Sequence, residues 1–150
     1  MNSFLAPSRK ARRHSTIRSA AHPASRFRHE INGIVADLLV DTDVFIDHLP
    51  GFRRLTASGN EIAYSAITRA ELFAGVRANP EAIELLLEPF REIDVDRNIA
   101  ELAGRLRRRH GTRIADALIG ATALHHDLVL TTRNIRDFRA LPELRIAEPD

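Results

Sequence analysis

Short apolar runs alternate with helical patterns along most of this chain, and no other feature limits its fold as strongly. Residues 34–40 end in a nearly continuous apolar run, which is typical of a buried parallel strand. Such alternation favours an α/β fold with a mainly parallel sheet. We predict further strands at 61–64, 91–95, 128–131 and 144–146, and helices at 44–49, 68–77, 80–87, 99–110 and 114–126.

The size and composition of the chain exclude several classes of protein. Its 150 residues suit one globular domain. The absence of cysteine excludes a disulfide scaffold, a thiolate metal site and a cysteine nucleophile. No apolar run approaches the roughly 20 residues needed to span a bilayer, and the N-terminus lacks the apolar core of a secretory signal. We therefore expect a cytoplasmic protein with no membrane partner.

Charge is unevenly distributed along the chain. Residues 1–30 contain seven basic residues and one acidic residue, a net charge of +6, whereas the remaining residues contain 15 basic and 19 acidic ones, a net charge of −4. We predict that residues 1–33 are a disordered basic extension and that residues 34–150 form the folded domain. The extension is interpreted either as functional, a nucleic-acid-binding arm or a targeting peptide, or as non-functional, a solvated tail or an extension from a start site placed too far upstream. We favour the non-functional interpretation.

Acidic residues follow the predicted strands at the points where a parallel sheet binds ligands. Carboxylates gathered at one edge repel one another unless a cation lies between them. Hard oxygen ligands of this kind suit Mg²⁺ or Mn²⁺. The residues are Asp41 and Asp43 after the first strand, Glu71 after the second, Asp116 at the start of the helix before the 128–131 strand, and Asn134 and Asp137 after that strand.

Each acid also has an ordinary structural interpretation. Thr68 and Glu71 match a capping box, so Glu71 alone is better explained as a helix cap. Asp116 suits the first turn of a helix, and Asp137 suits a solvated surface. Asp41 is the hardest to explain in this way, because a carboxylate next to a buried strand is costly without a partner. The shared placement of these acids favours the functional interpretation.

Four segments, in order along the chain, resemble the acidic motifs of the PIN domain family, and together they look most like the VapC toxins of bacterial toxin–antitoxin pairs. The resemblance covers about residues 36–150, and four ordered motifs are more specific than any single one. The segments are 38–47 (LLVDTDVFID), 65–77 (SAITRAELFAGVR), 114–124 (IADALIGATAL) and 131–138 (TTRNIRDF).

The resemblance implies a PIN-like three-layer α/β/α sandwich and a Mg²⁺- or Mn²⁺-dependent endoribonuclease that acts as a toxin. It implies catalytic roles for Asp41, Glu71, Asp116 and Asp137, with Asp41 and Asp116 as the principal metal ligands. It also implies RNA as substrate, an antitoxin protein as partner and a homodimer. Asn134 is not ionisable, so Asp137 must supply any fourth carboxylate. Asp43 stands where the family often has Asn, and either adds charge or orients water.

Further residues are expected to support this site. Thr131 and Asn134 are candidates to hydrogen-bond the metal ligands. An acidic pocket repels RNA, so arginines must hold its phosphates, although arginines at the end of a helix also suit the helix dipole. The candidate arginines are Arg105, Arg107, Arg108, Arg109, Arg113 and Arg133.

Several other protein classes share features of this sequence pattern. Haloacid-dehalogenase phosphatases and response-regulator receivers also place acids after a first strand, but both need a downstream lysine, and the only lysine here is Lys10. Acid–base catalysis by His125 and His126 is less favoured than a surface role at a helix end. A catalytically silent PIN-like binding module is disfavoured by the three retained acids, and a housekeeping RNA-processing PIN nuclease remains an alternative to the toxin.

Overall fold

Five parallel strands form the central sheet of the computed structural model, which describes residues 29–31, 34–47 and 61–149. The strand order is β5-β4-β3-β6-β7, and every neighbouring pair is parallel. The strands are β3 (Leu38–Val40), β4 (Ile62–Ser65), β5 (Arg91–Ile93), β6 (Val129–Thr131) and β7 (Ile146–Ala147). The predicted α/β fold with a parallel sheet is therefore confirmed, and β5 lies at an edge.

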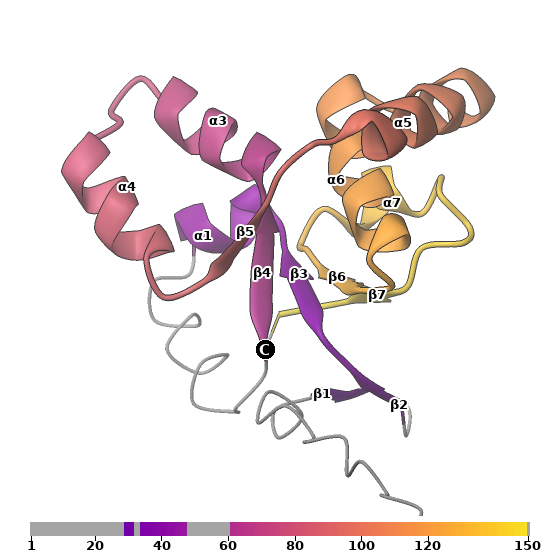
Figure 1. The fold of residues 1–150 in the computed structure, drawn as a ribbon, viewed down its shortest axis with the longest axis horizontal. Coiled ribbons are helices and arrows are strands. Elements are labelled where there is room, and N and C mark those ends of the chain that lie inside the picture. The colour runs from indigo at the N-terminus through magenta and orange to yellow at the C-terminus, as the bar shows by residue number, and fades with distance from the viewer. Residues whose placement is uncertain (1–28, 32–33, 48–60, 150) are drawn as a thin grey trace, which may run out of the picture.

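Helices cover both faces of this sheet, as Figure 1 shows. One face carries α1 (Thr42–Asp47), α3 (Ala66–Ala74) and α4 (Pro80–Leu87). The other face carries α5 (Arg97–His110), α6 (Ile114–His125) and α7 (Ile135–Phe138). The three-layer α/β/α arrangement is thus confirmed. Within the part of the chain that the structure describes, no helix is long and apolar enough to cross a membrane.

The alternation of side chains along each strand separates the core into two main layers. Leu39, Ala63 and Leu130 pack with α5 and α6 on one face. Val40 and Tyr64 point to the opposite face and pack with α1, α3 and α4. Residues of both layers are almost completely buried, so the ends of β3, β4 and β6 are held rigidly from both sides.

The strand order reverses beside the carboxyl end of β3, the position where open parallel sheets form a ligand-binding crevice. From β3 the chain continues to β4 and β5 on one side, and then returns to β6 and β7 on the other side. The segments that follow β3 and β6 therefore leave toward opposite faces, α1 on one and α7 on the other (Figure 1). Ligands of open parallel sheets bind at such a reversal of strand order. The register pairs Val40 with Thr131, so the residues that come next, Asp41 and Thr132, lie side by side.

The N-terminal part of the fold differs from the prediction. The apolar run at 34–40 forms two strands, of which β2 (Ile34–Ala36) pairs antiparallel with β1 (His29–Ile31) and only β3 joins the central sheet. The sequence Asn32-Gly33 between β1 and β2 is the strongest short signal for a hairpin. Strand β1 lies inside the predicted disordered segment 1–33, and the rest of that prediction, over residues 1–28, lies outside the described residues.

Two helices also begin or occur where the sequence pattern did not place them. Helix α1 begins at Thr42, directly after the strand, and the predicted helix end near Pro50 lies outside the described residues. Helix α7 was not predicted, because its four residues are too few to give a helical period. Helix α5 ends as predicted at Gly111, which takes the left-handed conformation with φ 70°.

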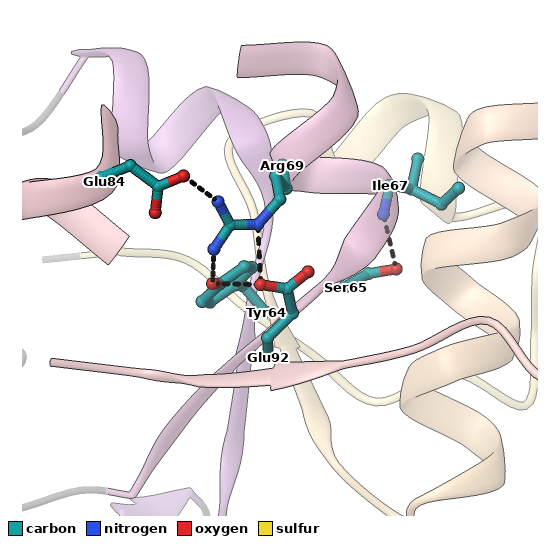
Figure 2. A network of polar contacts seen from close by, with 6 residues as sticks. All are labelled: Tyr64, Ser65, Ile67, Arg69, Glu84 and Glu92. Carbon is teal, nitrogen blue, oxygen red and sulfur yellow. Dashed lines mark hydrogen bonds and ion pairs between the residues drawn. The ribbon is translucent and has the colours of Figure 1, made fainter. Parts of the chain in front are cut away.

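A polar network around Arg69 joins the elements on the α3 side of the sheet (Figure 2). The Arg69 guanidinium donates to Glu92 Oε2 at 2.7 Å, to Glu84 Oε1 at 2.9 Å and to the Tyr64 hydroxyl at 3.0 Å. Tyr64 in turn donates to Glu92 at 2.7 Å. One side chain of α3 thus links β4, β5 and α4, while Ser65 caps the start of α3 by accepting from the Ile67 N–H. The Arg69 network and the Ser65 cap together fix the orientation of α3, and with it the position of Glu71.

Candidate active site

Asp41 occupies the buried centre of the crevice. Its backbone N–H continues the sheet by donating to the Thr131 carbonyl at 3.0 Å, which fixes the residue between β3 and β6. Its carboxylate is only 6% exposed and accepts from the Thr42 N–H at 2.7 Å and from the Thr132 hydroxyl at 2.8 Å. The pKa of Asp41 is raised from 3.8 to about 7, chiefly by burial and also by the charges of Asp43 and Glu71, while those two hydrogen bonds lower it. Asp41 is therefore a carboxylate that lacks a positive partner.

Glu71 reaches this centre from α3. The Thr42 hydroxyl donates a short hydrogen bond to Glu71 Oε2, which ties α3 to the residue after Asp41. Glu71 also acts electrostatically on Asp41 and on Asp116, raising the pKa of each. The alternative interpretation as a capping box is wrong, because Ser65 is the cap of α3 and Thr68 lies buried within the helix.

Asp116 approaches from the first turn of α6. Burial raises its pKa, as do the charges of Asp137 and Glu71, while Arg113 lowers it. Its Oδ2 atom is buried and has no hydrogen-bond partner. A buried acceptor without a donor is costly, so this oxygen is a natural ligand for a cation.

Asp137 and Asn134 form the outer part of the site, at α7. The Asn134 side-chain amide donates to Asp137 Oδ2 at 2.8 Å, and Asp137 is exposed at the surface. The electrostatic effect of Asp137 on Asp116 places the two carboxylates near each other. The four predicted acids, Asp41, Glu71, Asp116 and Asp137, are thus electrostatically coupled through a chain of neighbours.

Asp43 links the first acidic segment to the last. Its Oδ2 atom accepts from the backbone N–H groups of Arg133 at 3.1 Å and Asn134 at 2.9 Å. Its other oxygen, Oδ1, is buried and has no hydrogen-bond partner. The Thr132 hydroxyl lies between the two acids, donating to Asp41 and accepting from the Asn134 N–H at 3.0 Å.

The donor set fits a hard divalent cation. The unpartnered oxygens of Asp116 and Asp43 can accept a cation. The buried Asp41 carboxylate, whose pKa is about 7, is stabilised in its ionised form by a nearby positive charge. Among the described residues, no group of three or more His, Asp or Glu side chains is arranged so that it could hold a metal ion by itself. Ions such as Mg²⁺ keep several waters and need only one or two protein carboxylates, so an open arrangement suits them.

Two threonines were missed by the sequence analysis. Thr132, rather than the predicted Thr131, hydrogen-bonds the central carboxylate, and the Thr131 hydroxyl is buried without a partner. Thr42 holds Glu71 and was not singled out. The signal was the order of residues after each strand, because Thr132 follows β6 as Asp41 follows β3. Using it required the pairing of β3 with β6, which the sequence alone does not reveal.

The candidate arginines differ in their surroundings. Arg107 donates to the Thr112 carbonyl at 2.8 Å and so holds the α5–α6 turn, while Arg105 lies 3.9 Å from Glu101. Arg108, Arg109 and Arg113 are exposed, and Arg113 acts electrostatically on Asp116. The backbone of Arg133 binds Asp43 and its side chain is exposed. Arg113, in the turn between α5 and α6, is thus the arginine of this group whose charge lowers the pKa of Asp116.

The histidine pair lies away from this cluster. His125 ends α6, eleven residues after Ile114 begins it, so it is separated from Asp116 by most of the helix, on the order of 14 Å. His125 and His126 pack edge to face with ring centroids 5.1 Å apart. Burial lowers the pKa of His126, with smaller effects from His125 and Arg91. Their position gives no support to acid–base catalysis at the acidic site.

Comparison with known proteins identifies the same segment of the chain. A family model described as the PIN domain matches residues 38–144. Ribonuclease VapC19 of Mycobacterium tuberculosis is 38% identical over 120 residues, a match that covers 71% of this chain and 96% of that protein.

Solved structures with this fold come from toxin–antitoxin complexes. A chain of a toxin–antitoxin complex from Klebsiella pneumoniae is 31% identical with a TM-score of 0.63, over 76% of this chain and 98% of that one. A chain of VapBC2 from Rickettsia felis, solved bound to a DNA fragment from their promoter, is 25% identical with a TM-score of 0.61, over 75% and 98% of the two chains.

Proposed function

The chain belongs to the PIN domain family, and on that premise we propose that it is a metal-dependent ribonuclease that acts as the toxin of a toxin–antitoxin pair. Ribonuclease VapC19 is 38% identical to it over 120 residues, and the structural neighbours include toxin–antitoxin complexes. PIN-domain ribonucleases typically depend on a divalent metal, and the all-oxygen donor set here favours Mg²⁺ or Mn²⁺.

One observation carries the proposal for the site: Thr42, directly after Asp41, donates its hydroxyl to Glu71, whose charge raises the pKa of both Asp41 and Asp116. Three acids from β3, α3 and α6 therefore share one space, although 75 residues separate the first from the last. We assign Asp41 and Asp116 as the residues that would hold the cation, and Glu71 and Asp137 as supporting ligands or water-positioning groups. With a divalent cation bound, these residues would hold a water made more acidic by the metal and a positive charge that neutralises the attacked phosphate.

The residues of the chain itself orient this chemistry. Thr132 and the Thr42 N–H hold the two oxygens of Asp41 in one orientation, and the Thr42 hydroxyl holds Glu71. Because the pKa of Asp41 is about 7, its carboxylate is about half ionised at neutral pH, so the affinity for a cation would rise with pH. The burial of Asp41 excludes bulk water from the centre of the crevice and strengthens its interaction with positive charge.

RNA is expected to lie across the exposed arginines beside this crevice. Arg108, Arg109, Arg113 and Arg133 are exposed near the α5–α6 turn and the β6–α7 loop, where positive charge offsets the repulsion between carboxylates and phosphates. Arg107 is less suitable because it holds the Thr112 carbonyl. Neutralising Arg108 and Arg109 should weaken RNA binding and reduce its salt dependence.

The partners and location follow from the same proposal. We propose an antitoxin protein that binds this chain, a homodimer as the toxin's own assembly, RNA as substrate, and the cytoplasm as its location. Residues 34–150 would form the nuclease domain, and residues 1–33 an extension outside it.

Growth and cleavage assays test the proposal together. Expression of this chain alone should arrest growth, and co-expression with the protein encoded by the neighbouring gene should restore it. The purified chain should cleave RNA with Mg²⁺ or Mn²⁺ and lose that activity in excess EDTA. Asp116→Asn should abolish both effects, and Asp96→Asn should serve as the control, because Asp96 caps α5 and Asn caps equally well. Full cleavage in EDTA would contradict the proposal.

A further inference from the structure

We propose that Asp43 is a positioning residue that fixes the loop between β6 and α7 and thereby holds Asp137 at the acidic site. The inference rests on the proposed function, since it concerns the arrangement of the site rather than its identity. It resolves the alternatives left open by the sequence, in which Asp43 either adds charge or orients water.

The first step is a tie between two distant segments. Asp43 lies on α1, and its Oδ2 atom accepts from two consecutive backbone N–H groups, those of Arg133 at 3.1 Å and Asn134 at 2.9 Å. A carboxylate that accepts from two adjacent amides forms charge-assisted bonds and fixes the peptide between them. The tie joins residues 90 apart in the chain, and the Asn134 N–H also donates to a local acceptor, the Thr132 hydroxyl, at 3.0 Å.

The second step leads from the loop to Asp137. The same Asn134 whose backbone N–H binds Asp43 donates its side-chain amide to Asp137 Oδ2 at 2.8 Å. Asn134 also precedes α7, which carries Asp137 one turn later. The position of the loop peptide therefore sets the position of the Asp137 carboxylate, which acts on Asp116.

The tie uses only the Oδ2 atom of Asp43, so it holds the loop whether or not Oδ1 contacts a cation. One oxygen of Asp43 is already engaged with two N–H donors, while the 3.4 Å approach of the Thr132 hydroxyl to it is secondary to the 2.8 Å bond to Asp41. An amide at position 43 keeps one oxygen for the two N–H groups, whereas alanine keeps none. Asp43→Asn should therefore preserve the tie, and Asp43→Ala should remove it.

The first experiment measures the tie without any activity. Backbone amide exchange and the Asn134 side-chain amide resonance are followed by NMR in the wild type, Asp43→Ala and Asp43→Asn. Exchange at residue 133 should rise about tenfold or more in Asp43→Ala, with a smaller rise at residue 134, whose N–H keeps the Thr132 hydroxyl as acceptor. The Asn134 side-chain signal should also move, while Asp43→Asn should restore all of these. Unchanged exchange in Asp43→Ala would overturn the proposal, whatever the fate of the proposed ribonuclease function.

Asp96→Ala is the matched control for that experiment. Asp96 is also a carboxylate that accepts a backbone N–H, from Ile99 at 2.9 Å, and it interacts with His126 at the end of α6 opposite to Asp116. Its removal should lower the melting temperature without changing exchange at 133 and 134. A similar change in both variants would mean general destabilisation and would overturn the proposal.

The second experiment is a double-mutant cycle on RNA cleavage. Asp43→Ala should lower kcat about tenfold with little change in KM, and Asp43→Asn should restore most of the loss. In an Asp137→Asn background, Asp43→Ala should add less than about threefold, because the residue it positions is already disabled. An equal loss in both backgrounds would mean that Asp43 acts directly at the reacting centre, which overturns the proposal. Absence of cleavage by the wild type would instead reject the proposed function. The amide-exchange experiment would then be the test of the positioning role of Asp43.

Discussion

At the scale of single residues, the burial of the Asp41 carboxyl group lowers the stability of the folded chain when that group is ionised. Asp41 is nearly fully buried, and its pKa of about 7 means that the folded chain resists its ionisation. Two hydrogen bonds, from Thr42 and Thr132, lower the pKa but do not restore it to 3.8. A carboxylate in this condition is stabilised by a bound cation or by a proton, and perturbed acids of this kind cluster at functional sites.

Asp41→Asn should therefore change how stability depends on pH. The folded-state pKa lies above the unfolded value, so the contribution of Asp41 to stability is complete below about pH 4 and is lost as pH rises to about 7. One pKa unit corresponds to about 1.4 kcal/mol, so ionisation in the folded chain costs roughly 4 kcal/mol. In EDTA, Asp41→Asn should remove this slope and exceed the wild type by about 2 kcal/mol or more at pH 8. Urea unfolding across pH 4–8 measures it, and parallel profiles would contradict the account.

Two neighbouring threonines give a matched test of the hydrogen bond to Asp41. Thr132→Val removes the donor to Asp41, so the pKa of Asp41 should rise above about 7 and cleavage at neutral pH should fall roughly tenfold. Thr131→Val removes a buried hydroxyl that has no partner, so it should stabilise the fold by about 1 kcal/mol and leave the pKa unchanged. The ¹³C chemical shift of the Asp41 carboxyl group reports both. The same shift in both variants would show that the Thr132 bond has no special role.

At the scale of elements, helix α6 both carries a residue of the acidic site and packs in the core. Its first turn presents Asp116 to the site, while its middle packs closely beneath the C-terminal segment. Gly120 makes that close approach possible, because a Cβ added there would lie 2.7 Å from Leu141 Cδ1. Leu141 is buried in the core, so it has little room to move aside.

Two glycines within helices should therefore respond in opposite ways to alanine. Gly120→Ala should destabilise the fold by about 1–2 kcal/mol, since overpacking outweighs the gain in helix propensity. Gly104→Ala in α5 meets nothing within 4 Å and should stabilise by about 0.5–1 kcal/mol. Thermal unfolding of the two variants beside the wild type measures the difference. Stabilisation by both would mean that α6 is not closely packed against Leu141.

At the scale of the whole molecule, the alternation of strands and helices and the positions of the acids after them could be predicted from the sequence. The register between neighbouring strands could not. Asp41 follows a buried strand and Asp116 begins a helix, so a parallel sheet brings them to one edge. The role of Thr132 depends on the alignment of β3 with β6, two strands about 90 residues apart, which no local pattern encodes. Glu71 was ambiguous for a related reason: a cap and a ligand need the same residue type, and only the N-cap at Ser65 decides against the first.

Removal of the basic N-terminal segment tests the predicted division of the chain. The cut is best made before β1, so that residues 29–150 keep the β1–β2 pairing. If residues 1–28 are not part of the nuclease, this shorter chain should match the full one in melting temperature, cleavage rate and the salt dependence of RNA binding. A markedly shallower salt dependence after truncation would instead assign the basic segment to RNA binding, by close to one slope unit for each lost phosphate contact.

The central claim is that Asp41 and Asp116 hold a divalent cation, and Mn²⁺ binding measured by electron paramagnetic resonance tests it most directly. Free Mn²⁺ is counted in titrations of the wild type, Asp41→Asn, Asp116→Asn and the Asp96→Asn control at pH 8, where Asp41 is ionised. The account predicts binding by the wild type and by Asp96→Asn, and a loss of at least about tenfold in affinity for each of the other two variants. Equal Mn²⁺ binding by all four proteins would contradict it.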